Sequence, residues 1–295
     1  MDSEPKGSGE PNPKESELGN DDLESLANAL DEAITDANAP SLSNQRQIRR
    51  RRHRLIGIAT GLAVLLVGIL LWSGGYFSSE EEVVEVLTIA PDRLFEQLCA
   101  DVRKNQAKKF HVTGFKVSDS MMSEIADLDW VETFIIDQGE LSGQSMETIA
   151  KLSSLQHLRL RLSPVDDAGM EALSKCKSLW YLNLPHAECT SKGVAALRNL
   201  PRLRQLRLGS KNLNNDVTRE IAAIGSLRGI HLIGVPVTDE GLKTLAVMPH
   251  LESLYLDDSA VTEAGWDWLF QEHPHLHVHI NQSHHDRDPK HHAHH

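Results

Sequence analysis

The chain repeats one pattern of apolar and polar positions every 24 residues. Seven consecutive blocks open at Lys104, Leu128, Leu152, Cys176, Leu200, Ile224 and Met248. Counted from 1 at the opening residue, positions 7 and 9 are apolar in every block, as Phe110 and Val112 are in the first. A sustained period of this length is typical of a solenoid, in which each unit buries its apolar face against the next. We therefore expect stacked units over residues 104–282.

Each block is predicted to form one short strand and one helix. Apolar positions 7 and 9 alternate as the inward side of a strand does, so positions 6, 8 and 10 face the other way. A helix start follows. In the sixth block Thr238 or Asp239 is expected to accept hydrogen bonds from the first free helical amides. Leu242 and Leu245 then have the spacing of a helix that packs back onto the strand.

The blocks resemble the leucine-rich-repeat family, specifically its ribonuclease-inhibitor-like branch with a V-T-D-x-G-L signature. The signature is found at Val237–Leu242, Val165–Met170 and Val261–Trp266, and more loosely at Cys189–Val194. The fifth block has Val217 in place of the glycine, and the first two blocks lack it as well. The resemblance implies an α/β solenoid: an arc of about seven strand–helix repeats, with strands on the concave face and helices outside.

Both ends of the solenoid need caps. At the front, residues 78–103 are predicted to form a linker and a cap, with a strand at Val83–Ile89 and a helix that opens at Pro91. At the back, Leu276, Val278 and Ile280 alternate as a last strand.

One segment before the repeats is apolar enough to cross a membrane. Residues 55–72 contain no charge, and as a helix they would extend about 27 Å. Five arginines lie between Arg49 and Arg54, whereas Glu80, Glu81 and Glu82 follow the segment. The positive-inside rule then predicts a single-pass signal-anchor at residues 55–77, with a cytoplasmic N-terminus and an extracytoplasmic repeat domain.

Two other interpretations of this region are less favoured. A cleaved signal peptide would not follow fifty-four residues, and the arginines abut an apolar run, which favours a topogenic role over nucleic-acid binding. Gly57 and Gly61 have the GxxxG spacing that allows two helices to pack closely, although glycine is common in such helices. Dimerisation through this pair is a weak prediction, and the oligomeric state stays open.

Residues 1–54 are predicted to form an acidic, mostly disordered cytoplasmic tail with a basic end. The first 45 residues contain eleven Asp and Glu but two Lys, and they lack aromatic residues. Asp21–Ala37 has an apolar face at helical spacing. It is either a docking helix for a soluble partner or a marginal helix without a role.

The candidate binding site lies on the predicted concave face. Arg and Tyr side chains, which often anchor interfaces, gather at positions 6, 8 and 10 of the central blocks. The predicted contact residues are His157, Arg159, Arg161, Tyr181, Asn183, Arg207, His231 and Tyr255. A protein or an anionic glycan is the expected ligand, and a solvated face without a ligand is the alternative.

Histidine is concentrated at the C-terminus, where ten of the sixteen lie at or beyond His273. Residues 283–295 are predicted to be a His-rich disordered tail. No cofactor is expected, but loose binding of Zn, Cu or Ni is an option for His275, His277, His279, His284 and His285. The three cysteines follow no disulfide pattern, and Cys176 and Cys189 occupy core positions.

The sequence contains no HExxH, GxSxG or phosphate-binding glycine loop, so an enzyme is not expected. The favoured function is a membrane-anchored leucine-rich-repeat protein that binds another protein, or an anionic glycan, through its concave face. Two alternatives remain open: a cell-envelope scaffold without a specific ligand, and an envelope protein that binds metal through its histidine tail.

Overall fold

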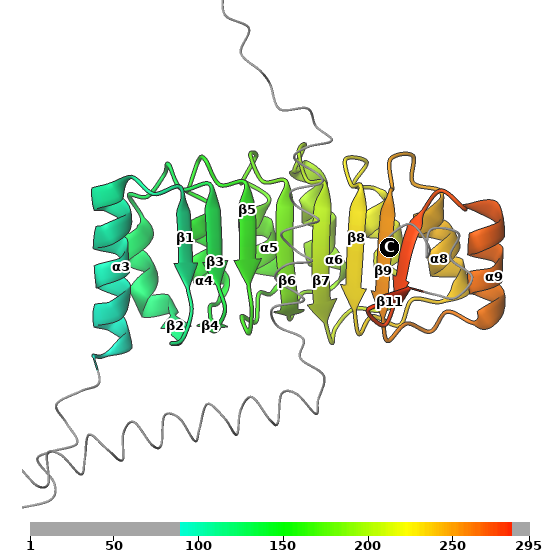
Figure 1. Ribbon diagram of the computed structural model, residues 1–295, viewed down its shortest axis with the longest axis horizontal. Coiled ribbons are helices and arrows are strands. Elements are labelled where there is room, and N and C mark those ends of the chain that lie inside the picture. The colour runs from blue at the N-terminus through cyan, green and yellow to red at the C-terminus, as the bar shows by residue number, and fades with distance from the viewer. Residues whose placement is uncertain (1–88, 285–295) are drawn as a thin grey trace, which may run out of the picture. The chain divides into compact units, whose positions relative to one another are not determined.

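The computed structural model describes residues 89–284 (Figure 1). The predicted acidic tail, membrane segment, Gly57–Gly61 pair and Val83–Ile89 strand (except Ile89) lie outside the described residues, as does the tail from residue 285. Over the described range, no helix combines the length and the apolar composition that a membrane crossing requires.

Within the described range the strands form one nine-stranded sheet in the order β1-β3-β5-β6-β7-β8-β9-β10-β11. They are β1 (Lys109–Val112), β3 (Thr133–Ile136), β5 (His157–Leu160), β6 (Tyr181–Ala187), β7 (Gln205–Ser210), β8 (Gly229–Ile233), β9 (Ser253–Asp257), β10 (His277–Ile280) and β11 (Ser283–His284). Consecutive strands from β1 to β10 are parallel. A second pair, β2 (Val117–Ser118) and β4 (Gly139–Glu140), lies at the first two turns.

The pairing register matches the sequence period. Phe110 lies opposite Phe134, which lies opposite Leu158, and each partner is the same position of the next block. The inward side chains therefore stack as columns: Phe110 and Phe134 are fully buried, with parallel rings whose centroids are 4.9 Å apart. The predicted α/β solenoid, with seven strand–helix units and end caps, is confirmed for residues 89–284.

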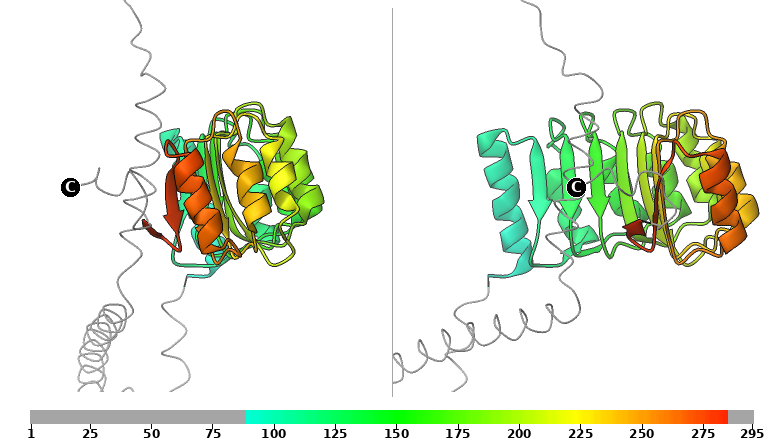
Figure 2. Two further views of the ribbon diagram at one scale, coloured as in Figure 1. Left: turned by 90° about the vertical axis from the view of Figure 1, so that its right-hand side faces the viewer. Right: turned by 45° about the vertical axis from the view of Figure 1, so that its right-hand side comes forward.

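The helices lie on the opposite side of the core from the sheet (Figures 1 and 2). They are α3 (Pro91–Asn105), η1 (Asp119–Ile125), α4 (Gly143–Ile149), α5 (Asp167–Leu173), α6 (Ser191–Ala196), η2 (Leu197–Asn199), α7 (Val217–Ala222), α8 (Asp239–Ala246) and α9 (Glu263–Glu272). Since a helix is wider than the spacing of two strands, a row of helices outside a row of strands curves the stack. The strands line the inner side of this curve (Figure 2).

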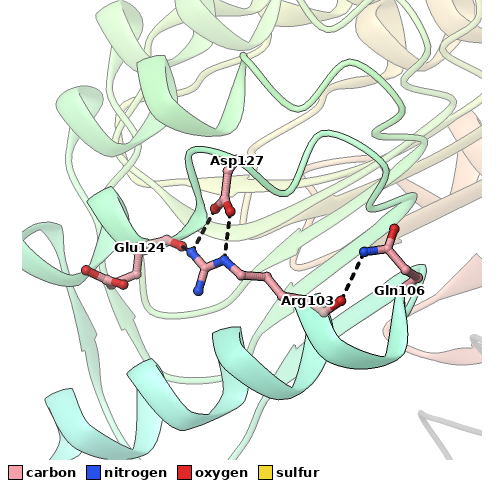
Figure 3. Close-up of polar contacts among 4 residues, drawn as sticks. All are labelled: Arg103, Gln106, Glu124 and Asp127. Carbon is pink, nitrogen blue, oxygen red and sulfur yellow. Dashed lines mark hydrogen bonds and ion pairs between the residues drawn. The ribbon is translucent and has the colours of Figure 1, made fainter.

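The N-terminal cap is the predicted helix, α3, which begins at Pro91 and covers the open end of the core. Its buried face consists of Phe95, Cys99 and Val102. At its last turn Arg103 donates two hydrogen bonds of 2.7 Å to Asp127 and a third, of 2.5 Å, to the carbonyl of Glu124 (Figure 3). The cap is thus held to the first repeat by an apolar face and by one bidentate ion pair.

The C-terminal cap contains an element that the sequence pattern does not reveal. The predicted last strand is present as β10, and β11 then folds back antiparallel to it. Ser283 and His284 therefore belong to the sheet, so the prediction that residues 283–295 are all disordered tail is wrong for these two. Pairing by β11 covers the backbone groups of an otherwise open edge.

A ladder of polar side chains joins several helix starts to the next block. Where position 16 is Asp or Asn, its side chain accepts hydrogen bonds from position 15 of the following block, whereas the second and fourth blocks have Gly143 and Ser191 at position 16. Asp167 accepts from the amide and hydroxyl of Thr190, both at 2.7 Å, and from the amide of Gly193 at 3.1 Å. Asn215 and Thr238 repeat this contact, as do Asp239 and Thr262.

The ladder corrects one sequence-based expectation. Thr238 does not cap its own helix: its amide and hydroxyl both donate to Asn215 of the preceding block. Asp239 accepts from Thr262 of the following block instead. At α8 the acceptor comes from the neighbouring unit because the 24-residue register places Asn215 beside the Thr238 amide, whereas Asp166, Thr190 and Thr262 each accept from an amide of their own helix.

The same contact explains the glycine of the V-T-D-x-G-L pattern. A Cβ at Gly193 would overlap the Asp167 carboxylate and lie 3.0 Å from the Asp167 Cα. Cβ atoms at Gly241 and Gly265 would likewise overlap Asn215 and Asp239. At these three sites glycine is needed because the acceptor of the preceding block fills the space of a side chain, whereas at Gly169 the space is filled by Val165 and Met146.

We expect Gly193→Ala to lower the free energy of unfolding by about 1–3 kcal/mol, because the added methyl must displace a hydrogen-bonded carboxylate. Gly225→Ala is the matched control, since nothing lies within 4 Å of its Cβ position. Urea unfolding followed by circular dichroism measures both. Equal stability of the two variants would contradict this account of the glycine.

The carboxylates of the ladder also predict a loss of stability in acid. Hydrogen bonds from Thr262 lower the pKa of Asp239, and at Asp167 burial, which raises the pKa, is outweighed by hydrogen bonds from Thr190 and Gly193. A carboxyl with a lowered pKa in the folded state stabilises that state above its unfolded pKa, and this contribution is lost as pH falls below about 4.

Asp239→Asn should retain the contact, as Asn215 does naturally, while it removes one titrating group. The unfolding free energy of this variant should therefore fall less steeply with pH than that of the wild type below about pH 4. Denaturant unfolding at a series of pH values measures the slope, and parallel curves would contradict the assignment.

Candidate functional site

The middle strands bring three polar side chains into one row. Arg159, Asn183 and Arg207 occupy position 8 of successive blocks, and the register pairs Arg159 with Asn183 and Asn183 with Arg207. His157 and Tyr181 form the adjoining row at position 6, with ring centroids 4.1 Å apart. The structure thus brings together five of the eight predicted contact residues at the centre of the concave face.

Three of these residues are buried rather than exposed. Arg159 retains 6% of its accessible surface, Tyr181 5% and Asn183 1%. Parallel strands are only about 4.8 Å apart, so long side chains on a curved inner face cover one another. The partly exposed residues Arg161 and Arg207 therefore form the accessible part of this cluster.

The buried row is held by polar contacts that extend to a flanking carboxylate. Arg159 Nη2 donates to Asp137 at 2.6 Å, and Asp137 also lies 3.1 Å from His111 Nε2. Asn183 Nδ2 donates to the Tyr181 hydroxyl at 3.1 Å. Burial would raise the pKa of Asp137, but the contacts with His111 and Arg159 lower it, so this residue is a carboxylate at neutral pH.

The row nevertheless contains unpaired polar atoms. Among the described residues, five buried side-chain nitrogen or oxygen atoms have no hydrogen-bond partner, and four of these belong to this cluster. They are His157 Nε2, Arg159 Nε, Asn183 Oδ1 and Arg207 Nε. Each such atom costs about 1–3 kcal/mol relative to a paired one. Their concentration in one place distinguishes the centre of the concave face from the rest of the core.

The charge at the centre is not balanced. Within residues 89–284 neither Arg161 nor Arg207 has a carboxylate partner, whereas Arg159 is paired with Asp137. The pKa of His157 is lowered to about 4, first by burial and then by the charges of Arg159 and Lys109. Burial, then Arg161 and Arg207, also lower the pKa of His186. Both histidines are therefore neutral at pH 7.

His186 is a site residue that the sequence did not reveal. It occupies position 11, outside the columns expected to line the concave face. The Leu162 amide donates to its Nδ1 at 3.3 Å, where Leu162 has a left-handed backbone (φ 56°). The left-handed backbone of Leu162 recurs at position 11 of other blocks, in Gly114, Gly234 and Asp258, but no other block has a histidine there, so no repeated residue pattern marks this contact.

The other predicted contact residues form a second cluster toward the C-terminus. His231 Nε2 lies 2.9 Å from Asp257, at the same pair of positions as His111 and Asp137. Asp257 is buried and also accepts from the Gln282 amide at 3.1 Å. The ring of Tyr255 lies 5.4 Å from that of His231. Both pairs could have been predicted from the sequence, because in each case an aspartate follows a histidine at position 8 by 26 residues.

Two of the histidines considered for metal binding converge. The Nε2 atoms of His277 and His279 are 2.9 Å apart on one side of β10, whereas His275 precedes the strand and its ring lies 5.7 Å from that of His273. His284 pairs with His279 through the β11 backbone, and His285 lies outside the described residues. Over residues 89–284 no cluster of three or more His, Cys, Asp or Glu is arranged to hold a metal ion.

The cysteines behave as core residues. Cys99, Cys176 and Cys189 are buried, and burial raises the pKa of their thiols to about 12, 11 and 12, respectively. A protonated, enclosed thiol is a poor nucleophile.

Comparison with known proteins finds likenesses of fold only. No protein-family model matches the chain, and no curated protein matches it. Among solved structures, an internalin from Listeria monocytogenes aligns at 15% identity and a TM-score of 0.44, covering 59% of this chain and 54% of that one. A plant peptide hormone receptor, solved in complex with RGF2, aligns at 16% identity and 0.36, covering 55% of this chain and 30% of that one. Neither likeness bears on what this chain binds.

We expect His157 to titrate near pH 4. Because its folded pKa lies below the unfolded value of about 6.5, the folded state takes up a proton less readily, and the free energy of unfolding falls as pH decreases from 6.5 toward 4. Imidazole carbon shifts in NMR spectra measure the pKa directly. His157→Gln should remove this part of the pH dependence, and a His157 titration near 6.5 would contradict the enclosed, positive environment.

Proposed function

We propose that the chain is a membrane-anchored leucine-rich-repeat protein of the ribonuclease-inhibitor-like branch, which binds a protein partner through the centre of its concave face. The observation that carries the proposal is the unbalanced pair Arg161 and Arg207 beside a row of buried, unpaired polar atoms. A partner carboxylate could reach the partly exposed guanidinium groups of Arg161 and Arg207, which have no carboxylate partner among the described residues. The rigid sheet beneath them fixes their positions.

The proposal assigns the chain no catalytic activity. Its support is chemical: the thiols are enclosed and protonated, and the sequence contains none of the hydrolase or phosphate-binding motifs named above. The concave residues instead have the character of a recognition surface, with guanidinium, imidazole and phenol groups side by side.

The proposed location is a single membrane crossing with the repeats on the extracytoplasmic side. It rests on the uncharged run at residues 55–72, the arginines between Arg49 and Arg54, and the acidic residues Glu80–Glu82. On this proposal the acidic tail and the repeats face different compartments.

Charge reversal at the centre of the concave face tests the binding proposal. We expect the double variant Arg161→Glu, Arg207→Glu to lose the partners that the full-length wild type retains after cross-linking in cells. Arg202→Glu is the matched control, because Arg202 is exposed in the turn before β7. Identical partners for all three proteins would favour a scaffold without a specific ligand.

Protease treatment of intact cells tests the location. We expect externally added protease to remove an epitope placed after residue 284 while an N-terminal epitope stays protected. Permeabilised cells, in which both epitopes become accessible, are the control. The reverse pattern would place the repeats in the cytoplasm.

A further inference from the structure

The strand ends at the centre of the solenoid place three hydrogen-bond donors around one area. Arg161 directly follows β5, His186 lies near the end of β6 and Arg207 lies in β7. The register places Arg207 opposite Asn183, three residues before His186, and the amide of Leu162, the residue after Arg161, donates to the His186 ring. Within the described residues, neither arginine forms an ion pair.

The hydrogen bond to His186 fixes which ring nitrogen faces outward as a donor. Since Nδ1 accepts from the Leu162 amide, it carries no proton. The ring is neutral at pH 7 because burial and the two arginines lower its pKa, so its single proton is on Nε2. His186 thus contributes an N–H group, and the area contains donors from three successive strands.

The limits of the positive area define the size of its ligand. On the N-terminal side, Asp137 follows β3, the strand before β5, and is already paired with Arg159 and His111. On the C-terminal side, Asp257 lies two strands beyond Arg207 and already forms hydrogen bonds with His231 and Gln282. A long polyanion that followed the arc would pass from the unbalanced charges of Arg161 and Arg207 to carboxylates that are already paired, and would gain little there. A short anionic group fits between them.

The spacing of the donors favours a peptide as the carrier of that group. Arg161 and Arg207 are partly exposed and His186 is exposed, whereas the unpaired atoms beneath them are enclosed. The three donors belong to successive strands, and neighbouring strands are about 4.8 Å apart. Several acidic side chains of one peptide can span this distance, whereas one small inorganic anion cannot.

We propose that Arg161, His186 and Arg207 bind the carboxylates of a short acidic segment in the protein partner. This inference rests on the proposed function, since it names the chemistry recognised at the same concave site. Arginine forks bind carboxylates through two parallel hydrogen bonds, which gives the contact direction as well as strength.

A labelled hexaglutamate peptide tests this inference by fluorescence anisotropy with the full-length chain in detergent micelles. We expect binding that weakens with salt, and that falls about tenfold in Arg161→Gln and in Arg207→Gln, which corresponds to the loss of one charged contact. His186→Leu should also weaken binding, whereas Arg202→Gln should leave it unchanged. Hexaglutamine should not bind.

Equal affinity for hexaglutamate in all variants, or equal binding of hexaglutamine, would overturn the inference. Binding of heparin oligosaccharide without binding of hexaglutamate would also overturn it, in favour of an extended polyanion. Thermal melting identifies any variant that fails to fold, and the comparison of the three probes on wild type remains decisive in that case.

The proposed function has a separate test. If Tyr255→Ala abolished partner cross-linking while Arg161→Gln and Arg207→Gln left both cross-linking and hexaglutamate binding unchanged, the concave face would still bind a partner and only the carboxylate assignment would fail.

Discussion

The fixed register between parallel strands is the constraint on which the rest of this structure depends. Every block places its residues opposite the same positions of its neighbours, so a side chain meets its counterparts rather than an unrelated surface. Buried positions become continuous columns of Leu, Ile and Val, and each block completes the core of the one before it. The energetic unit is consequently the interface between blocks, and an isolated block would leave most of its apolar surface in water.

The same register also aligns the polar groups. The contacts that stabilise the stack lie at the helix starts, apart from the proposed binding site on the concave face. At the helix starts, Asp167 and its equivalents satisfy the free amides of the next block, and glycine at position 18 makes room for them. This edge of the solenoid is fully engaged in holding the stack together. On the concave face the equivalent contacts are incomplete: Asp137 and Asp257 each engage a histidine and Asp137 also engages Arg159, but Arg161 and Arg207 have no carboxylate partner among the described residues. The proposed ligand site is this incomplete part of the pattern.

Much of the fold follows from the sequence because one period determines it. The apolar columns at Phe110 and Val112 and the cap helix at Pro91 were predictable from local spacing, and the structure has them. What was not predictable depends on contacts between blocks. Thr238 looked like a cap for its own helix, yet its partner is Asn215, 23 residues earlier. Arg159 and Asn183 looked like surface residues, yet the curvature of the sheet buries them. His186 belongs to the site through its contact with Leu162 of the preceding block, and no other block has a histidine at this position.

The centre of the concave face is positively charged, although the domain as a whole is acidic. Residues 89–284 contain more acidic than basic side chains, so the positive area is local and does not reflect the composition of the whole. Long-range attraction of a highly charged partner would be weak, since salt screens the field beyond about one Debye length of 8–10 Å and the surrounding carboxylates oppose it. On the proposed function, recognition at this site would depend on short-range geometry: the two guanidinium groups and the oriented imidazole would have to meet acceptors directly. Such a surface would select for the placement of a few carboxylates in a partner rather than for its total charge.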